Sequence, residues 1–332
     1  MLNPMTLARA RNFILISLAC AFAGLAAQHA HAAFPDRPIK LVVPFAPGGG
    51  TDLVARTMGI AMGQELGQPV IIDNKPGAGT IIGTDAVAKS APDGYTMVMA
   101  TVAHVVNPSL QPKLPYNHEK AFAPVMLVGI SPNVLVVRAD SPLKSVKDLL
   151  DAARKDPGKL SFASQGAGTS AHLAGELFKN LTRTNITHIP YRGAGPAITD
   201  LLGGQVDVMF ATAAAVGNFV ESGKLRALAV TTATRSAAPA LAKVPTIAES
   251  GVPGYVADSW YGLYAPAGTP ADVIVRLNAA AKKAVQTEAF RKRVESEGLV
   301  IQAGSPQDFD KYAKGEEARW RKVVKENNIT AE

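Results

Sequence analysis

Cysteine is almost absent from this sequence of 332 residues, in which Cys20 is the only one. A single thiol cannot form a disulfide within the chain, and a metal site built from several cysteines is excluded for the same reason. Cleavage after Ala32 would remove Cys20 and leave no cysteine nucleophile. Lipid attachment to Cys20 is the alternative, but Ser17 stands where a lipobox usually has Leu or Val.

Strong charge of one sign and long apolar runs are also lacking. The net charge is +7, from 34 basic and 27 acidic residues, and falls to +5 without Arg9 and Arg11. The basic residues are spread along the chain with few aromatic neighbours, so we expect no nucleic-acid partner. A mild positive field could gather small acidic ligands, although a solvated basic surface is the simpler interpretation. No run after residue 27 is long and apolar enough to span a bilayer.

The N-terminus has the pattern of a secretory signal peptide. Arg9 and Arg11 precede an uncharged run from Phe13 to Ala27, and Ala30-His31-Ala32 offers small residues for cleavage. The run is too short for a permanent anchor and is followed by this cleavage pattern. We therefore predict a signal peptide at residues 1–32, cleaved near Ala32, and export of the mature protein.

Apolar runs alternate with helical patterns along the rest of the chain. Residues 39–45 form a nearly continuous apolar run, which suits a buried parallel strand. Strand and helix patterns alternate up to Ala100, residues 107–120 look irregular and contain proline, and a second alternating set runs from 160 to 230. This alternation predicts two layered α/β units with right-handed crossovers.

The C-terminal part predicts how these units share the chain. Amphipathic helices follow Pro266 and need a surface to cover, for which the first sheet is the natural candidate. We therefore expect the chain to cross between two doubly wound α/β lobes twice, near residues 130 and 258. Lobe 1 would comprise residues 33–130 and 258–332, and lobe 2 residues 131–257.

Two glycine-rich loops follow predicted strands and precede predicted helices. One contains Gly48-Gly49-Gly50, and the other runs from Ser164 to His172 with Thr169 or Ser170 as the helix N-cap. Free N–H groups and the helix dipole favour an anion at such places. The pair therefore suggests one anion held between two lobes. The alternative is that each loop is only a tight turn.

Familiar catalytic and cofactor motifs do not fit these loops. The first loop lacks the lysine of a P-loop, and the second lacks the third glycine and the acidic partner of a dinucleotide site. Gly168-Thr169-Ser170-Ala171-His172 is not a nucleophile elbow. We therefore expect neither a catalytic residue nor a cofactor.

The histidines give no metal signal either. His104, His118, His172 and His188 do not show the helical i, i+4 spacing of metal ligands, so we expect no metal site. For His172 the simpler interpretation is packing behind the loop. Asp52 could likewise satisfy a helix N-terminus and order its loop without touching a ligand.

Several motifs, in order along the chain, resemble the tripartite tricarboxylate transporter solute-binding receptors, also called the Bordetella uptake gene (Bug) family. The resemblance covers essentially the whole predicted mature chain. The motifs are highly specific together, although the glycine loops are weak singly. They are Pro44–Asp52, Asn74–Gly79, Ala163–Phe178, Pro190–Gly193, Leu202–Asp207 and Ala265–Pro270.

The resemblance implies a periplasmic solute-binding receptor with the two-lobed type II periplasmic-binding-protein, or Venus-flytrap, fold. Such a monomer would capture a small carboxylate, largely through main-chain groups and bridging waters, and deliver it to integral membrane transporter subunits without catalysis. The implied ligand-binding residues are Phe45, Ala46, Gly49 and Asp52 on one side, Ser164, Gln165, Gly168 and Thr169 on the other, and Thr101, His104, Tyr191 and Asp207 around the remainder.

Two other functions stay open at this point. A secreted hydrolase or isomerase acting on an organic acid would need an acid or base, for which His104 and Asp207 are candidates. A sensory receptor would dock on a membrane kinase instead of a transporter. The ligand could be an aromatic acid, a dicarboxylate, a tricarboxylate or an amino acid. Arg192 could pair with a second carboxylate or simply be a solvated flank residue.

Overall fold

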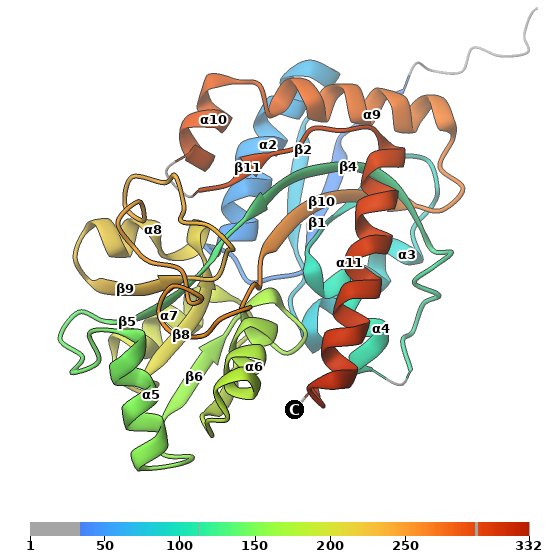
Figure 1. The fold of residues 1–332 in the computed structure, drawn as a ribbon. Helices are drawn as coiled ribbons and strands as arrows, with labels where there is room; N and C mark the ends of the chain where they lie inside the picture. The colour runs from blue at the N-terminus through green and yellow to red at the C-terminus, as the bar shows by residue number, and fades with distance from the viewer. Residues whose placement is uncertain (1–33, 112, 296–297, 332) are drawn as a thin grey trace, which may run out of the picture. The chain divides into compact units, whose positions relative to one another are not determined.

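The computed structural model describes residues 34–111, 113–295 and 298–331. The predicted signal peptide and Cys20 lie outside the described residues. The chain from Arg37 onward forms one compact unit, in which two lobes are each built on their own sheet (Figure 1). Among the described residues, no helix combines the length and apolar character that crossing a bilayer requires.

Lobe 1 is built on a six-stranded sheet in the order β11-β4-β10-β3-β1-β2. The strand β1 (Ile39–Val43) pairs in parallel with β2 (Val70–Asn74) and β3 (Thr96–Ala100). Strand β10 (Ser259–Pro266) runs antiparallel to β3 and to β4 (Phe122–Ser131), and β4 also pairs with β11 (Val300–Ile301). Lobe 1 therefore combines a parallel half with an antiparallel half, in which β4 leaves for the other lobe and β10 returns from it.

Helices cover both faces of this sheet because each has one apolar side. The C-terminal helix α11 packs on α4 and β4 and crosses the front of the sheet in Figure 1, while α9 packs on α2. The helices of lobe 1 are α2 (Gly50–Leu66), the short 3-10 helix η1 (Ala78–Thr80), α3 (Ile81–Ala88), α4 (Val102–Leu110), α9 (Ala271–Ala284), α10 (Glu288–Glu295) and α11 (Pro306–Glu326).

Helix α4 corrects one expectation, because the sequence predicts irregular chain from Asn107 onward. Pro108 lies inside this helix, where it removes one backbone hydrogen bond. The helix continues to Leu110 because Val102, Val105 and Val106 are buried in the core. Burial of the apolar side thus outweighs the cost of proline.

Lobe 2 is built on a five-stranded sheet in the order β7-β6-β8-β5-β9. The parallel strands are β7 (Thr187–Pro190), β6 (Ser161–Ser164) and β8 (Val208–Thr212), and β5 (Asn133–Arg138) runs antiparallel to β8 and β9 (Leu225–Val230). Its helices are α5 (Val146–Lys155), α6 (Ser170–Thr182), α7 (Ala194–Leu202) and α8 (Ala213–Glu221).

The chain passes between the sheets at two adjacent places. Strand β4 ends at Ser131 and β5 begins at Asn133, whereas β9 ends at Val230 and β10 begins at Ser259. The N–H of Thr231 donates to the carbonyl oxygen of Asn133 at 3.0 Å, and the N–H of Ala257 donates to that of Thr231 at 2.9 Å. The two links between the lobes are therefore hydrogen-bonded to each other.

Candidate functional site

The two glycine-rich loops share one cavity between the lobes. The first loop leaves β1 and begins α2, and the second leaves β6 and begins α6, so both lie at the carboxyl ends of parallel strands. The cavity has a volume of about 190 Å³. It is lined by Pro44, Phe45, Gly77, Ala78, Gly79, Thr80, Gln165, Gly166, Ala167, Pro190, Tyr191 and Arg192.

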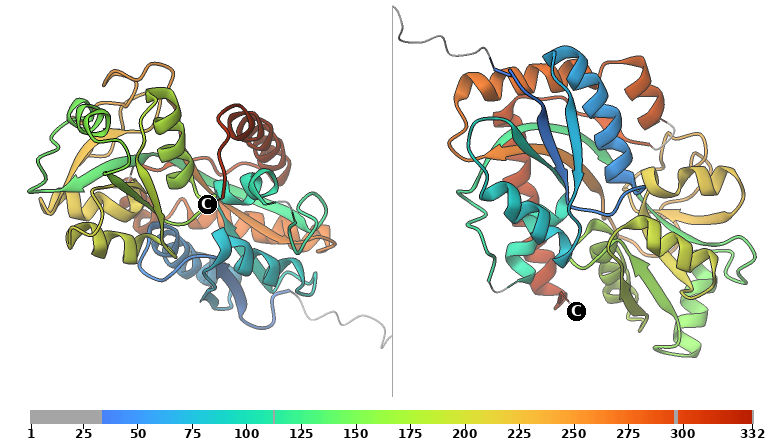
Figure 2. Two further views of the ribbon diagram at one scale, coloured as in Figure 1. Left: turned by 90° about the horizontal axis from the view of Figure 1, so that it is seen from below. Right: turned by 180° about the vertical axis from the view of Figure 1, so that it is seen from behind.

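The lobes touch each other around this cavity. The N–H of Ala46 in lobe 1 donates to the carbonyl oxygen of Arg192 in lobe 2 at 3.1 Å. A Cβ on Gly50 would lie 2.7 Å from the side chains of Thr212 and Ala214, and the start of α2 packs on α8 (Figure 2, right). The cleft is therefore closed, and Gly50 permits this approach of the two lobes.

Asp52 organises the first loop from behind. Its buried carboxylate accepts hydrogen bonds from the Gly48 N–H, from Arg56 Nε and from Asn74 Nδ2, each at 2.9 Å. Burial alone would raise the pKa of Asp52, but the hydrogen bonds from Arg56, Gly48 and Asn74 together hold that pKa below its usual value. Both carboxylate oxygens therefore have protein partners, and Asp52 lies outside the set that lines the cavity.

The second loop is held by its own side chains. Thr169 is the N-cap of α6, and its hydroxyl accepts from the His172 N–H at 3.4 Å and donates to the Gly166 carbonyl at 2.7 Å. The N–H of Gly166 donates to Ser164 Oγ at 3.1 Å, and that of Gly168 to His172 Nδ1, also at 3.1 Å. These two N–H groups are thus used within the loop and are not directed at a ligand. This differs from the expectation that free N–H groups at the helix N-terminus bind the anion.

His172 and His188 form a buried pair behind this loop. Their rings stack with centroids 4.3 Å apart, and His188 Nε2 lies 2.7 Å from Ser164 Oγ. Burial, with a smaller contribution from Lys179, lowers the pKa of His172 to about 4. Burial, followed by the effects of His172 and Lys179, lowers the pKa of His188 to about 3. Both rings are therefore neutral at pH 7, and His172 packs behind the loop.

These histidines and Glu176 form the one group of metal-type ligands found among the described residues. One ligand atom from each lies within 4.8 Å of the others, and the i, i+4 relation of His172 to Glu176 escaped the sequence analysis. The two ring planes, however, stack at 24°, so their nitrogen lone pairs do not converge on one point. Lys179 Nζ also lies 2.7 and 3.0 Å from the two Glu176 oxygens and already occupies the place of a cation.

Most of the expected site residues lie in or beside the cleft. Phe45, Gln165 and Tyr191 line the cavity, and the Tyr191 hydroxyl donates to Asp200 at 2.7 Å. Thr101 is the N-cap of α4, where its buried hydroxyl oxygen has no hydrogen-bond partner among the described residues. The loops around the cavity contain Ala46, Gly49, Ser164, Gly168 and Thr169.

The structure places His104 and Asp207 away from the cavity between the lobes. Helix α4 directs His104 onto Tyr264, with ring centroids 4.5 Å apart, and thereby into a different cavity. Asp207 accepts from the Ser161 N–H at 2.8 Å, at the first residue of β6. The second glycine-rich loop follows the last residue of that strand, so Asp207 lies at the opposite end of the sheet.

The loop at residues 77–80 contributes lining residues that the sequence analysis missed. Gly77, Ala78, Gly79 and Thr80 have φ values of 128°, 47°, 59° and 80°. Asn107 Nδ2 holds this backbone by donating to the Gly79 carbonyl at 2.9 Å. Pro76-Gly77-Ala78-Gly79 predicts a turn, and a non-glycine residue with positive φ marks a site whose backbone is constrained for a reason.

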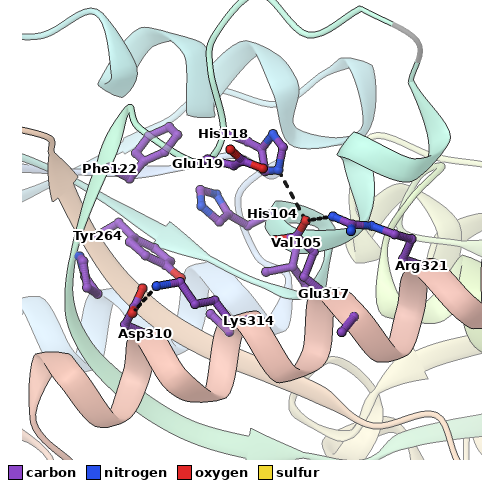
Figure 3. A pocket seen from close by; sticks show the side chains of 13 residues that line it. His104, Val105, His118, Glu119, Phe122, Tyr264, Asp310, Lys314, Glu317 and Arg321 are labelled. Atoms are coloured by element: carbon purple, nitrogen blue, oxygen red, sulfur yellow. Dashed lines mark hydrogen bonds and ion pairs between the residues drawn. The ribbon is translucent and has the colours of Figure 1, made fainter.

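The cavity that contains His104 is larger, about 410 Å³, and lies beside α11 (Figure 3). Most of its charged side chains are paired. Glu317 Oε1 lies 3.4 Å from His118 Nε2 and also contacts Arg321. Lys314 Nζ lies 2.6 Å from Asp310 Oδ2. Burial, and secondarily His118, lowers the pKa of His104 to about 4, so this ring is neutral. Only lobe 1 contributes lining residues, so closing the lobes does not enclose this cavity.

The sequence matches the family described as "Tripartite tricarboxylate transporter family receptor" over residues 54–329. It is 41% identical to a UPF0065 protein of Pseudomonas sp. strain P51, over 97% of this chain and 96% of the relative. It is 40% identical to the protein BugT of Bordetella pertussis, over 95% of this chain and 97% of the relative.

Solved structures agree with this match and share the fold of a periplasmic binding protein. The periplasmic binding protein BugD superposes with a TM-score of 0.86 at 34% identity, over 90% of this chain and 99% of that one. A Rhodopseudomonas palustris protein with adipate superposes with a TM-score of 0.85 at 37% identity, over 90% of this chain and 99% of that one. MatC of the same organism, with bound malate, superposes with a TM-score of 0.83 at 34% identity, over 88% of this chain and 100% of that one. The two-lobed type II fold predicted from the sequence is thus confirmed.

Proposed function

Since this chain belongs to the receptors of the tripartite tricarboxylate transporter family, we propose that its cleft captures a small dicarboxylate. Relatives with 37% and 34% identity were solved with adipate and with malate, which both carry two carboxylates. The receptor would release its ligand to integral membrane transporter subunits. Capture by closure of two lobes removes the anion from water and strengthens each hydrogen bond to it.

The observation that carries this proposal is the cavity shared by the two loops. Helices α2 and α6 begin beside it, and helix N-termini favour anions. The carboxylate of Asp52 would oppose an anion, but Arg56 lies 2.9 Å away and compensates its charge. One ligand carboxylate is therefore expected between residues 44–50 and residues 165–170, with bridging waters completing its hydrogen bonds.

Arg192 supports the second carboxylate. Among the described residues that line the cavity, it is the one with a full charge, and its guanidinium has no hydrogen bond or ion pair within the described chain. It is exposed, so its charge is accessible to a ligand that enters the cavity. The neighbouring Tyr191 is engaged with Asp200 and stays protonated, because burial and this hydrogen bond raise its pKa to about 12.

The proposal covers the remaining expectations as well. The protein would act as a periplasmic monomer exported by the signal peptide at residues 1–32. The lobes would divide at the two links, as residues 33–130 with 258–332 and residues 131–257. Binding without turnover is favoured because His104 and Asp207, the candidate acid and base, lie outside the cleft cavity. Ligand contacts would come from the lining residues, which include Arg192 but not Asp52, His104 or Asp207.

A thermal-shift screen tests the ligand class. Adipate and malate should stabilise the protein, by about 2.7 kcal/mol at a hundred times the dissociation constant. Hexanoate, which matches adipate in length but has one carboxylate, is the control and should bind at least about tenfold more weakly. Equal affinity for hexanoate and adipate would reject the dicarboxylate, and stabilisation by no carboxylate at all would reject the carboxylate cleft.

A further inference from the structure

Asn133 lies at the first link between the lobes and is completely buried. Its main chain joins the second link, because its N–H donates to Thr231 Oγ1 at 3.0 Å and its carbonyl accepts from the Thr231 N–H. Its side chain continues the connection, since Nδ2 donates to the Ala257 carbonyl at 2.9 Å. One residue thereby fastens both links to each other.

The oxygen of the same Asn133 side chain reaches the second glycine-rich loop, where that loop enters α6. Asn133 Oδ1 accepts a hydrogen bond from Ser170 Oγ at 3.1 Å. Ser170 is the first residue of α6, directly after the N-cap Thr169, and is also buried. A single amide therefore spans from the second link to the loop that lines the cleft, although Asn133 itself does not line the cavity.

A parallel connection runs through the residue before it. The Pro132 carbonyl accepts from the N–H of Ala213, the first residue of α8, at 2.9 Å. Thr212, which precedes α8, accepts from Nε2 of the cavity residue Gln165 at 3.2 Å. The N-termini of α6 and α8 are thus both hydrogen-bonded to the first link.

We propose that Asn133 is a positioning residue for ligand capture, which couples the angle between the lobes to the orientation of loop 164–170. The coupling rests on the proposed function, because capture by closure requires the loop to meet lobe 1 in one orientation. Bending at the links moves the Ala257 carbonyl relative to β5, and the rigid amide transmits this movement to Ser170. Ligand affinity then depends on a residue that never touches the ligand.

The residue type at this position follows from the two partners. Ser170 needs an acceptor and Ala257 needs a donor, and only an amide of this length offers both from one side chain. An aspartate has the same shape but sets an oxygen against the Ala257 carbonyl. An apolar residue would leave the buried Ser170 hydroxyl without its acceptor, which is costly, and would leave the Ala257 carbonyl with the Thr231 hydroxyl as its one remaining side-chain donor.

The test measures the lobes and the affinity separately. Spin labels at Lys89→Cys and Lys147→Cys report the distance between lobes, and the full chain carries Cys20→Ser so that no other thiol reacts. Asn133→Asp should broaden or shift the distance distribution of the ligand-free protein. It should also weaken adipate binding about tenfold, and Ser170→Ala should do so less strongly. The double variant should match Asn133→Asp alone, because both changes break one connection.

Thr182→Ala is the matched control, since its buried hydroxyl bonds the Phe178 carbonyl at 2.6 Å at the far end of the same helix. It should lower the melting temperature but leave the distances between the spin labels unchanged and the affinity for adipate within about twofold. If Asn133→Asp and Ser170→Ala behave like this control, or their effects simply add, the coupling is refuted. If the wild type binds neither adipate nor malate, the proposed function fails, while the distances still decide the coupling.

Discussion

The amide N–H of Gly168 donates a hydrogen bond to Nδ1 of His172, 3.1 Å away, so the cleft loop depends on a neutral imidazole. Protonation of Nδ1 would turn this acceptor into a donor and set two N–H groups against each other. Ser164 Oγ lies 2.7 Å from Nε2 of His188, whose ring stacks on that of His172. The geometry of the loop is therefore linked to the protonation of His172.

We expect the free energy of unfolding to fall as the pH drops below about 6.5, the ordinary pKa of histidine. His172 and His188 have folded-state pKa values of about 4 and about 3. In this window the unfolded chain takes up protons that the folded chain refuses, so stability is complete above pH 6.5 and is lost toward pH 4 and below. Each histidine contributes at most about 1.4 kcal/mol per pH unit.

Urea unfolding at several pH values between 7 and 4 measures this loss. The control is His172→Asn, whose Oδ1 can still accept from the Gly168 N–H but does not titrate. This variant should show a flatter dependence on pH than the wild type. Identical slopes for the two proteins would show that His172 does not titrate in this window.

A side chain at Gly168 should keep the cleft from closing. A Cβ there would lie 2.6 Å from Asn107 Oδ1, and the residue has a φ of 76°, which strains any other residue. Gly168→Ala should therefore weaken adipate binding by at least about tenfold, measured by calorimetry. Gly223→Ala is the matched control, because Gly223 has a φ of 67° and nothing within 4 Å. It should lose similar stability but no affinity, and equal losses of affinity would contradict the steric explanation.

Asp52 should matter more for stability than for binding. Asp52→Asn keeps the shape but removes the charge that accepts from Gly48 and Arg56, so we expect a loss of about 1–2 kcal/mol in the free energy of unfolding. Affinity for adipate should change less than about threefold if the carboxylate has no contact with the ligand. The pair Lys147 and Asp151 on the surface offers a control, since Asp151→Asn should cost well under 1 kcal/mol. A large loss of affinity in Asp52→Asn would return Asp52 to the ligand-binding set.

Much of the fold could be predicted because each sheet is assembled from local patterns. The strand from Ile39, the helix after Gly50 and the cap at Thr169 all follow from nearby residues. Helix α4 escaped prediction because Pro108 breaks the local pattern, and burial of its valines is a tertiary effect. The antiparallel course of β10 depends in the same way on the return of the chain from lobe 2.

The candidate site was predictable where residues follow a strand directly, and unpredictable where a helix or a strand end decides the direction. Phe45 and Gln165 lie within two residues of a strand end and line the cavity. His104 lies only four residues beyond β3, but one turn of α4 directs it onto Tyr264. Asp207 precedes its strand, and its motif alone does not show which end of the sheet it occupies.

Arg192 gives the sharpest test of the ligand class. Arg192→Gln should weaken adipate binding about tenfold, because the second carboxylate would lose a charge-assisted hydrogen bond. Hexanoate, which lacks that carboxylate, should bind the variant and the wild type equally well. Arg154→Gln changes an exposed arginine on α5 of the same lobe and controls for the loss of one positive charge at a distance. If both arginine variants weaken adipate equally, the long-range field attracts the ligand; if neither does, Arg192 is a solvated flank residue and the cavity binds one carboxylate.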